Sequence, residues 1–123
     1  MEVEALGQHI SRSFNEDLER VRNSVLNMGG MVEEQLDRAL KALKDADSEL
    51  GLQVAADDVK INQMEVSIDE ECSRILATRA PHAGDLRLIF ATIKRITDLE
   101  RIGDEAEKIG ALAARLATVE RPS

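Results

Sequence analysis

Apolar side chains recur through the first third of the chain at intervals of three and four residues. The members of this stripe are Phe14, Leu18, Val21, Val25, Met28, Val32, Leu36, Ala39 and Leu43. Such intervals place side chains on one face of an α-helix, close to a heptad repeat. We therefore expect a first helix over about residues 10–46, preceded by a frayed segment over residues 1–8.

Two adjacent glycines, Gly29 and Gly30, lie inside this stripe without changing its phase. Two glycines disfavour a helix by roughly 2 kcal/mol in total, so tertiary packing must hold the helix together here. Close approach of a neighbouring helix is the expected reason for them, and a kink is the alternative.

A second apolar stripe follows Asp47, whose side chain suits a helix N-cap. Its members are Leu50, Val54, Ile61, Met64, Ile68, Cys72 and Ile75. This stripe predicts a second helix over about residues 48–78. Asp57 projects onto the apolar line of that helix. A polar face beside the line carries Asp58, Asn62, Glu65 and Asp69.

A third stripe follows Pro81, and its residues are apolar in the first half and acidic in the second half. Pro81 disfavours helical geometry at Ala80 and suits a helix start just after it, which predicts a third helix over about residues 83–119. The first half of the stripe consists of Leu86, Ile89, Ile93 and Ile96. At about 100° per residue, the same face continues with Glu100, Asp104 and Glu107.

Carboxylates in line with a core stripe require compensation, because they are rarely buried unless they are paired or bind a metal. Glu100 and Asp104 are spaced i, i+4, so their side chains share one side of the helix. These two residues and Glu107 are the candidate metal ligands. The other interpretation is a solvated helix end whose acids pair with lysine and arginine.

Short connections between the three stripes make neighbouring helices antiparallel. The pattern therefore predicts an all-α protein, an up-down-up bundle of three long helices within a single domain over residues 1–123. Aromatic residues are only 2% of the chain, which also fits helix packing better than a β-sandwich.

Charge and cysteine content restrict the partners and the compartment. The net charge of −8 argues against nucleic acid and anionic membrane as partners. No apolar run approaches the roughly 20 residues that span a bilayer, so no membrane insertion is expected. Cys72 is the only cysteine, which favours a reducing cytoplasm. It is interpreted as a core residue.

Motifs for catalysis are missing from the pattern. No Ser-His-Asp arrangement or phosphate-binding loop is evident, and a di-iron bundle would need Glu-x-x-His pairs that this chain lacks. We therefore expect no catalytic residues and no enzymatic activity.

Several segments together resemble the PhoU family, over nearly the whole chain. They are Met28–Glu33, Asn62, Met64–Val66, Ile68–Cys72, Ala77–Pro81, Asp85–Ile89 and Leu99–Asp104. The resemblance implies a protein built from two tandem three-helix repeats, of which this chain has the length of the first.

The resemblance also implies a function. Members of this family are expected to be cytosolic accessory proteins of the high-affinity phosphate transporter. The resemblance implies that they bind its ATPase subunit and a sensor histidine kinase, and so act as negative regulators of phosphate-starvation signalling. Two half-length chains should then pair as a homodimer, because their apolar faces would otherwise meet water.

A family metal motif, Glu/Asp-x-x-x-Asp, falls on Glu100 and Asp104, and Glu107 extends it by one turn. The metal would be Fe, Mn, Zn or Mg. Weaker candidates on the polar face of the second helix are Asp58, Asn62 and Glu65. The alternative is a structural bundle that dimerises and has no metal role.

Overall fold

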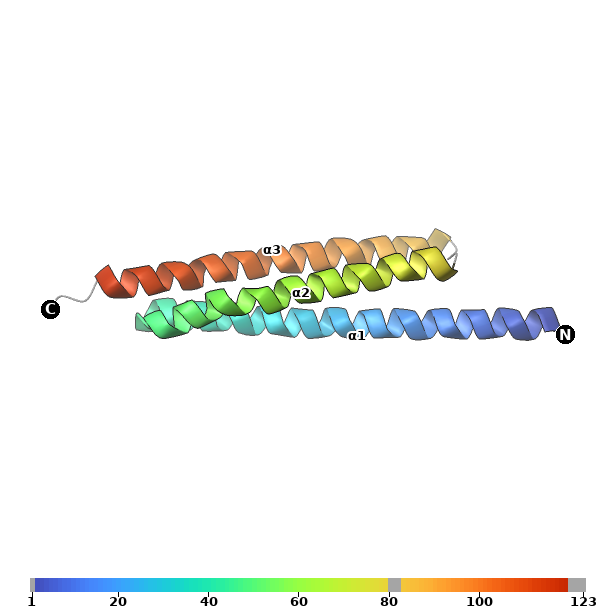
Figure 1. The fold of residues 1–123 in the computed structure, drawn as a ribbon, viewed down its shortest axis with the longest axis horizontal. Helices are drawn as coiled ribbons and strands as arrows, with labels where there is room; N and C mark the ends of the chain where they lie inside the picture. The colour runs from blue at the N-terminus through green and yellow to red at the C-terminus, as the bar shows by residue number, and fades with distance from the viewer. Residues whose placement is uncertain (1, 80–82, 120–123) are drawn as a thin grey trace.

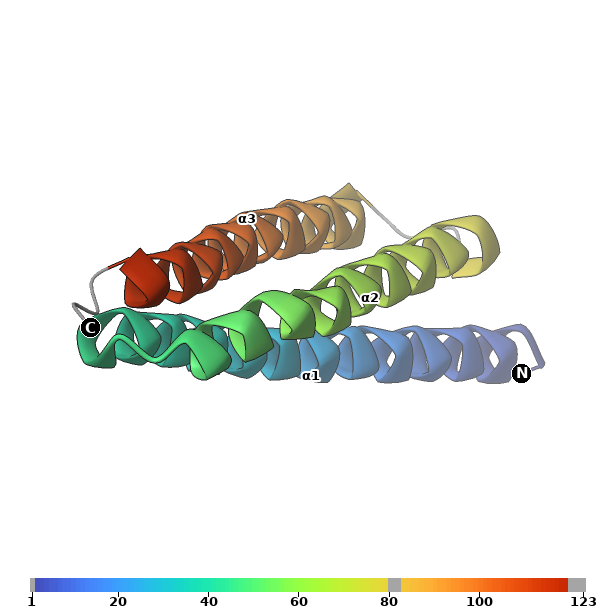
Figure 2. The same ribbon diagram turned by 60° about the vertical axis from the view of Figure 1, so that its left-hand side comes forward.

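Three long helices lie side by side along the long axis of this computed structural model (Figures 1 and 2). They are α1 (Glu2–Asp45), α2 (Ser48–Arg79) and α3 (Ala83–Val119). The chain runs up, down and up, so that the start of α1 and the end of α3 lie at opposite ends of the bundle. The predicted all-α three-helix bundle is confirmed.

The structure describes the backbone of residues 2–79 and 83–119, and side chains from residue 12 in α1 and residue 84 in α3. The segment with Ala80, Pro81 and His82, on which the predicted start of the third helix rests, lies outside the described residues.

The largest difference from the predicted boundaries is at the beginning of α1. This helix starts at Glu2, so the expectation of a frayed segment is wrong for residues 2–8. Val3, Leu6 and Ile10 continue the three-and-four spacing in front of Phe14, which accounts for the longer helix. The other helix boundaries lie within one residue of the predicted ones.

A tight turn ends α1 and begins α2. The N–H of Asp47 donates to the carbonyl of Ala42 at 2.9 Å, and Ala46 between the helices has a positive φ of 52°. This is the geometry of a left-handed helix C-cap. The Asp47 carboxylate then accepts from the N–H of Leu50 at 3.0 Å, as expected for the predicted N-cap.

The main core lies between all three helices. Its buried members are Phe14, Val21, Met28 and Val32 of α1, Ile61, Ile68, Cys72 and Ile75 of α2, and Ile89 and Ile96 of α3. A smaller cluster of Ala39, Val54 and Ala106 continues the core toward the α1–α2 turn. Cys72 is fully buried, and burial raises the pKa of its thiol, as do the charges of Asp69 and Glu71. These properties suit a core residue.

Helices α2 and α3 approach each other closely at two glycines, Gly51 and Gly110. A Cβ atom on Gly110 would lie 2.8 Å from the carbonyl oxygen of Gly51 and 3.0 Å from a Val54 methyl carbon. In contrast, a Cβ on Gly29 or Gly30 would meet no atom within 4 Å. The close approach expected at Gly29 and Gly30 is therefore wrong within the described chain, and occurs instead at Gly51 and Gly110.

Alanine at Gly110 and alanine at Gly30 should have opposite effects on stability. Gly110→Ala should lower the free energy of unfolding by about 1–3 kcal/mol, because the methyl group forces two backbones apart. Gly30→Ala, which enters open space in a helix, should raise it by about 1 kcal/mol. Urea unfolding followed by circular dichroism measures both. Equal stabilisation by the two variants would contradict this packing.

A buried carboxylate joins α1 to the last turns of α2. Asp17 is 1% exposed, and its carboxylate accepts from Arg79 at 2.9 Å and from Arg74 at 3.5 Å. Arg20, one turn along α1, also pairs with it. Burial alone would raise the pKa of Asp17. The hydrogen bond from Arg79 and the charges of Arg79, Arg74 and Arg20 outweigh burial and hold that pKa below its ordinary value.

An open apolar groove of about 640 Å³ lies between α1 and α3, with Cys72 and Ile75 of α2 among its lining residues. Leu26 and Leu88 also line it and are 63% and 51% exposed. Contiguous exposed apolar surface is typical of a site that contacts a partner.

None of the helices within residues 2–79 and 83–119 has the length and apolar character needed to cross a lipid bilayer.

Candidate metal centre

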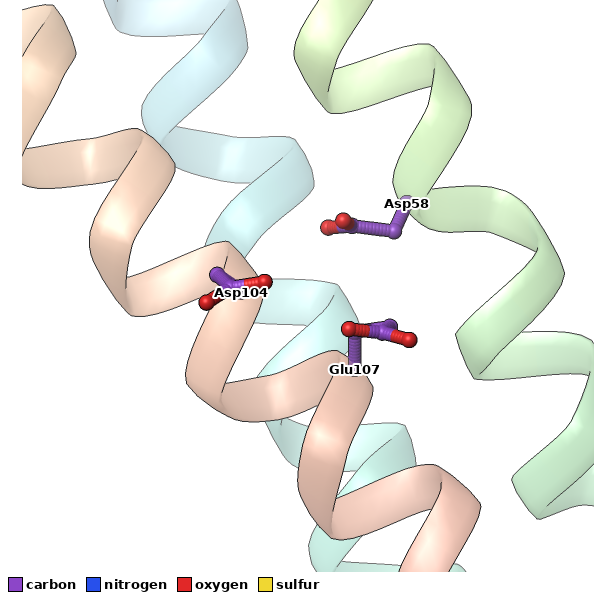
Figure 3. Close-up of side chains that lie close together, drawn as sticks. All are labelled: Asp58, Asp104 and Glu107. Atoms are coloured by element: carbon purple, nitrogen blue, oxygen red, sulfur yellow. The ribbon is translucent and has the colours of Figure 1, made fainter.

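Three carboxylates from two helices converge beside the small end of the core. Asp58 of α2 extends toward α3, where Asp104 and Glu107 lie nearly one turn apart (Figure 3). Each of the three offers an oxygen atom, and these oxygens all lie within 4.8 Å of one another. Asp58 is 8% exposed, whereas the other two are half-buried. We call these three residues the acidic cluster.

Packing of α2 explains why Asp58 points inward. The buried residues around it, Val54 and Ile61, are spaced four before and three after it. This spacing follows a heptad, so Asp58 takes a core position between two apolar neighbours. The prediction that Asp57 lies on the apolar line and Asp58 beside it is wrong. Asp57 instead pairs with Arg38 of α1 at 2.9 Å, near the surface.

The buried line of α3 also differs from the predicted one. After Ile89 and Ile96 it continues through Gly103, Ala106 and Gly110 rather than through the three acids. Such small residues let α2 and α3 approach closely. Asp104 directly follows Gly103, and Glu107 directly follows Ala106. Their side chains therefore lie at the edge of the contact between α2 and α3, where they approach Asp58.

Electrostatic repulsion inside the acidic cluster is only partly relieved. Burial raises the pKa of Glu107, and the nearby charges of Asp58 and Asp104 raise it further. Lys108 pairs with Asp104 at 3.3 Å, but its side chain is 62% exposed, and water screens such exposed pairs so that they contribute little. The cluster therefore retains negative charge that a cation would neutralise.

The donor set fits a hard metal ion. Carboxylate oxygens are the ligands that Mg²⁺ and Mn²⁺ prefer, and iron and zinc accept them as well. A second feature of the site is Gln35 of α1, which is 3% exposed and donates from Nε2 to an Asp58 oxygen at 3.1 Å. The apolar stripes did not reveal Gln35. The signal that could have found it is its place three residues after Val32 and four before Ala39.

The other predicted site residues lie apart from the acidic cluster. Burial raises the pKa of Glu65 of α2, and the negative charges of Glu100 and Asp69 raise it further. Glu100 is therefore near enough to Glu65 for their charges to interact, and it is not one of the three converging carboxylates. Asn62 is exposed and lines an outer surface of α2 together with Val59 and Val66. The structure thus brings Asp104 and Glu107 together with Asp58, and leaves Glu100 outside this group.

Comparison with known proteins supports one family. The PhoU domain matches residues 25–113 of this chain. The phosphate-specific transport system accessory protein PhoU homolog of Pseudomonas putida is 57% identical over 113 residues, which are 92% of this chain and 44% of that protein. The phosphate-specific transport system accessory protein PhoU of Escherichia coli K12 is 52% identical over 104 residues, or 85% of this chain and 43% of that protein.

A solved structure agrees with these sequence matches. The crystal structure of PhoU from Pseudomonas aeruginosa matches with a TM-score of 0.84 at 55% identity, over 88% of this chain and 52% of that one. The chain thus spans about half the length of these relatives. The match of the PhoU domain to most of its length shows that this chain belongs to the PhoU family.

Proposed function

We propose that this chain is a non-enzymatic regulatory adaptor of phosphate homeostasis in the cytoplasm. It docks on the ATPase subunit of a phosphate transporter and on a sensor histidine kinase, and represses phosphate-starvation signalling while phosphate is plentiful. The observation that carries this proposal is family membership, together with relatives named as accessory proteins of a phosphate-specific transport system. The kinase and the direction of regulation come from the family resemblance.

The acidic cluster is the proposed metal site of this adaptor. Asp58, Asp104 and Glu107 would hold an iron, manganese, zinc or magnesium ion, with the convergence of their oxygens and the raised pKa of Glu107 as support. A bound cation would supply positive charge between α2 and α3. The carboxylates themselves would orient toward it and hold the two helices together at this point.

A structural bundle that only dimerises is the second candidate. The apolar groove between α1 and α3 favours it, since this surface can be covered by another copy of the chain. Pairing of two copies is also part of the adaptor proposal. The two candidates therefore differ in whether the transporter and the kinase bind.

A capture experiment separates the candidates. The tagged 123-residue chain is tested against three partners, with Mn²⁺ or with a chelator: the transporter ATPase subunit, the cytoplasmic region of the kinase, and a second copy carrying another tag. The adaptor proposal expects retention of all three above a tag-only control. Retention of the second copy alone would support the structural bundle, and retention of none would contradict both.

A further inference from the structure

Gln35 is a buried amide at the contact of all three helices. Its Nε2 group donates to Asp58 at 3.1 Å and lies 3.5 Å from the carbonyl oxygen of Val54. Its Oε1 atom is buried and has no hydrogen-bond partner among the described residues. An unpaired buried amide oxygen destabilises the folded state, because it has given up its hydrogen bonds to water without replacing them. Core packing alone therefore does not explain glutamine at this position.

The amide has a definite effect on Asp58. Its N–H group engages one carboxylate oxygen and leaves the remaining lone pairs of Asp58 free for the acidic cluster. The reversed amide would place Oε1 against the same carboxylate oxygen, and two acceptors repel. The hydrogen bond therefore fixes both the amide orientation and the rotation of the Asp58 carboxylate.

Helix α3 is shaped around this pair. A Cβ atom on Gly103 would lie 3.1 Å from Gln35 Oε1 and 3.5 Å from an Asp58 oxygen. The amide and the carboxylate thus occupy the space that a side chain on α3 would need. Gly103 directly precedes Asp104, so the same contact sets the distance between Asp58 and the α3 members of the acidic cluster.

We propose that Gln35 is a positioning residue for a cation bound by Asp58, Asp104 and Glu107. It acts through Asp58, by holding that carboxylate toward α3. The inference rests on the metal part of the proposed function, and extends it to a residue outside the acidic cluster. Hydrogen-bond partners of metal-binding carboxylates typically change metal affinity by about 10–100-fold when they are replaced.

A double-mutant cycle tests this role with Mn²⁺ as the probe and calorimetry as the readout. Gln35→Met, which removes the donor but keeps the length, should weaken Mn²⁺ binding by about 10–100-fold. In the Asp58→Asn background, the same replacement should cause no further loss. Gln63→Met, an exposed replacement on α2, is the matched control and should bind Mn²⁺ like the unmodified chain. Thermal unfolding in chelator reports fold integrity for each variant.

The outcomes separate the inference from the proposed function. If the unmodified chain binds no Mn²⁺, the metal site itself fails, and the role of Gln35 fails with it. If it binds and folded Gln35→Met binds equally well, only the positioning role is overturned. A loss of equal size with and without Asp58 would also overturn it, since the effect would be structural. Should Gln35→Met unfold, Gln35→Asn, whose amide is too short to reach Asp58, replaces it under the same criteria.

Discussion

Replacing Asp17 by asparagine should lower the free energy of unfolding of this chain at pH 7 by about 3 kcal/mol. Asp17 is the acceptor shared by Arg79, Arg74 and Arg20, and only 2% of its side chain is exposed. Without its charge, three guanidinium groups face one another around a buried amide. We take the low end of the range for broken buried pairs, because the arginine side chains are 28–59% exposed and reach water.

The effect of this replacement should depend on pH. The pKa of Asp17 is lower in the folded chain than its ordinary value of 3.8, so the folded state binds fewer protons than the unfolded state. The stabilisation by Asp17 is therefore complete above pH 3.8 and is lost as the pH falls through the lower, folded-state pKa. Urea unfolding at pH 7 and at acidic pH should show the difference between the two chains shrinking in acid.

Glu16→Gln is the matched control for Asp17→Asn, because Glu16 is the exposed neighbour of Asp17 on the same helix. It should change the free energy of unfolding by less than about 0.5 kcal/mol. A change of similar size for Asp17→Asn at pH 7 would show that the buried ion pair contributes nothing to stability.

Mn²⁺ at a free concentration one hundred times its dissociation constant should raise the free energy of unfolding by about 2.7 kcal/mol. The increase should become much smaller in Asp58→Asn and in Glu107→Gln, since each removes one of the three converging carboxylates and leaves two to bind Mn²⁺ more weakly. Urea unfolding with Mn²⁺ and with chelator measures it. Asp98→Asn, an exposed replacement on α3, should retain the full increase.

Glu100→Gln tests which carboxylates bind the metal. The sequence predicted Glu100 as a ligand, whereas the fold brings Asp58 to Asp104 and Glu107 in its place. Because Glu100 is not part of the acidic cluster, this variant should keep most of the Mn²⁺-dependent stabilisation. Complete loss in Glu100→Gln, with full stabilisation in Asp58→Asn, would contradict the site described above.

The raised pKa of Glu107 predicts how Mn²⁺ binding and the free energy of unfolding should depend on pH. Protons compete with the cation, so Mn²⁺ binding should weaken as the pH falls through this pKa, at a higher pH than for an ordinary glutamate. Without metal, the folded state binds more protons than the unfolded state between pH 4.5 and that raised pKa. Stability therefore falls as the pH rises through this window. Glu107→Gln should accordingly stabilise the metal-free chain at pH 7.

The structure buries three polar residues that the apolar stripes did not predict to be buried, and these residues share one feature. Asp17, Gln35 and Asp58 all lie three or four residues from buried apolar neighbours on a heptad line. A straight helix of 3.6 residues per turn drifts by about 20° per heptad from a 3.5-residue repeat. Extending the isoleucine stripe of α3 at 100° per residue therefore led to Glu100, Asp104 and Glu107, while the packed face continued through small residues.

The sequence by itself determined the number of helices, their antiparallel order, the N-cap at Asp47 and the strip of α3 that carries Asp104 and Glu107. These features are local, because they depend on residue spacing and capping chemistry within one segment. Only the tertiary structure decided that Asp58 joins Asp104 and Glu107, that Gln35 donates a hydrogen bond to Asp58, and that Glu100 stays outside this group. These contacts cross between helices, so they depend on the axial offset and rotation of packed helices. The backbone contact at Gly51 and Gly110 is one of the close approaches that accompany that offset and rotation.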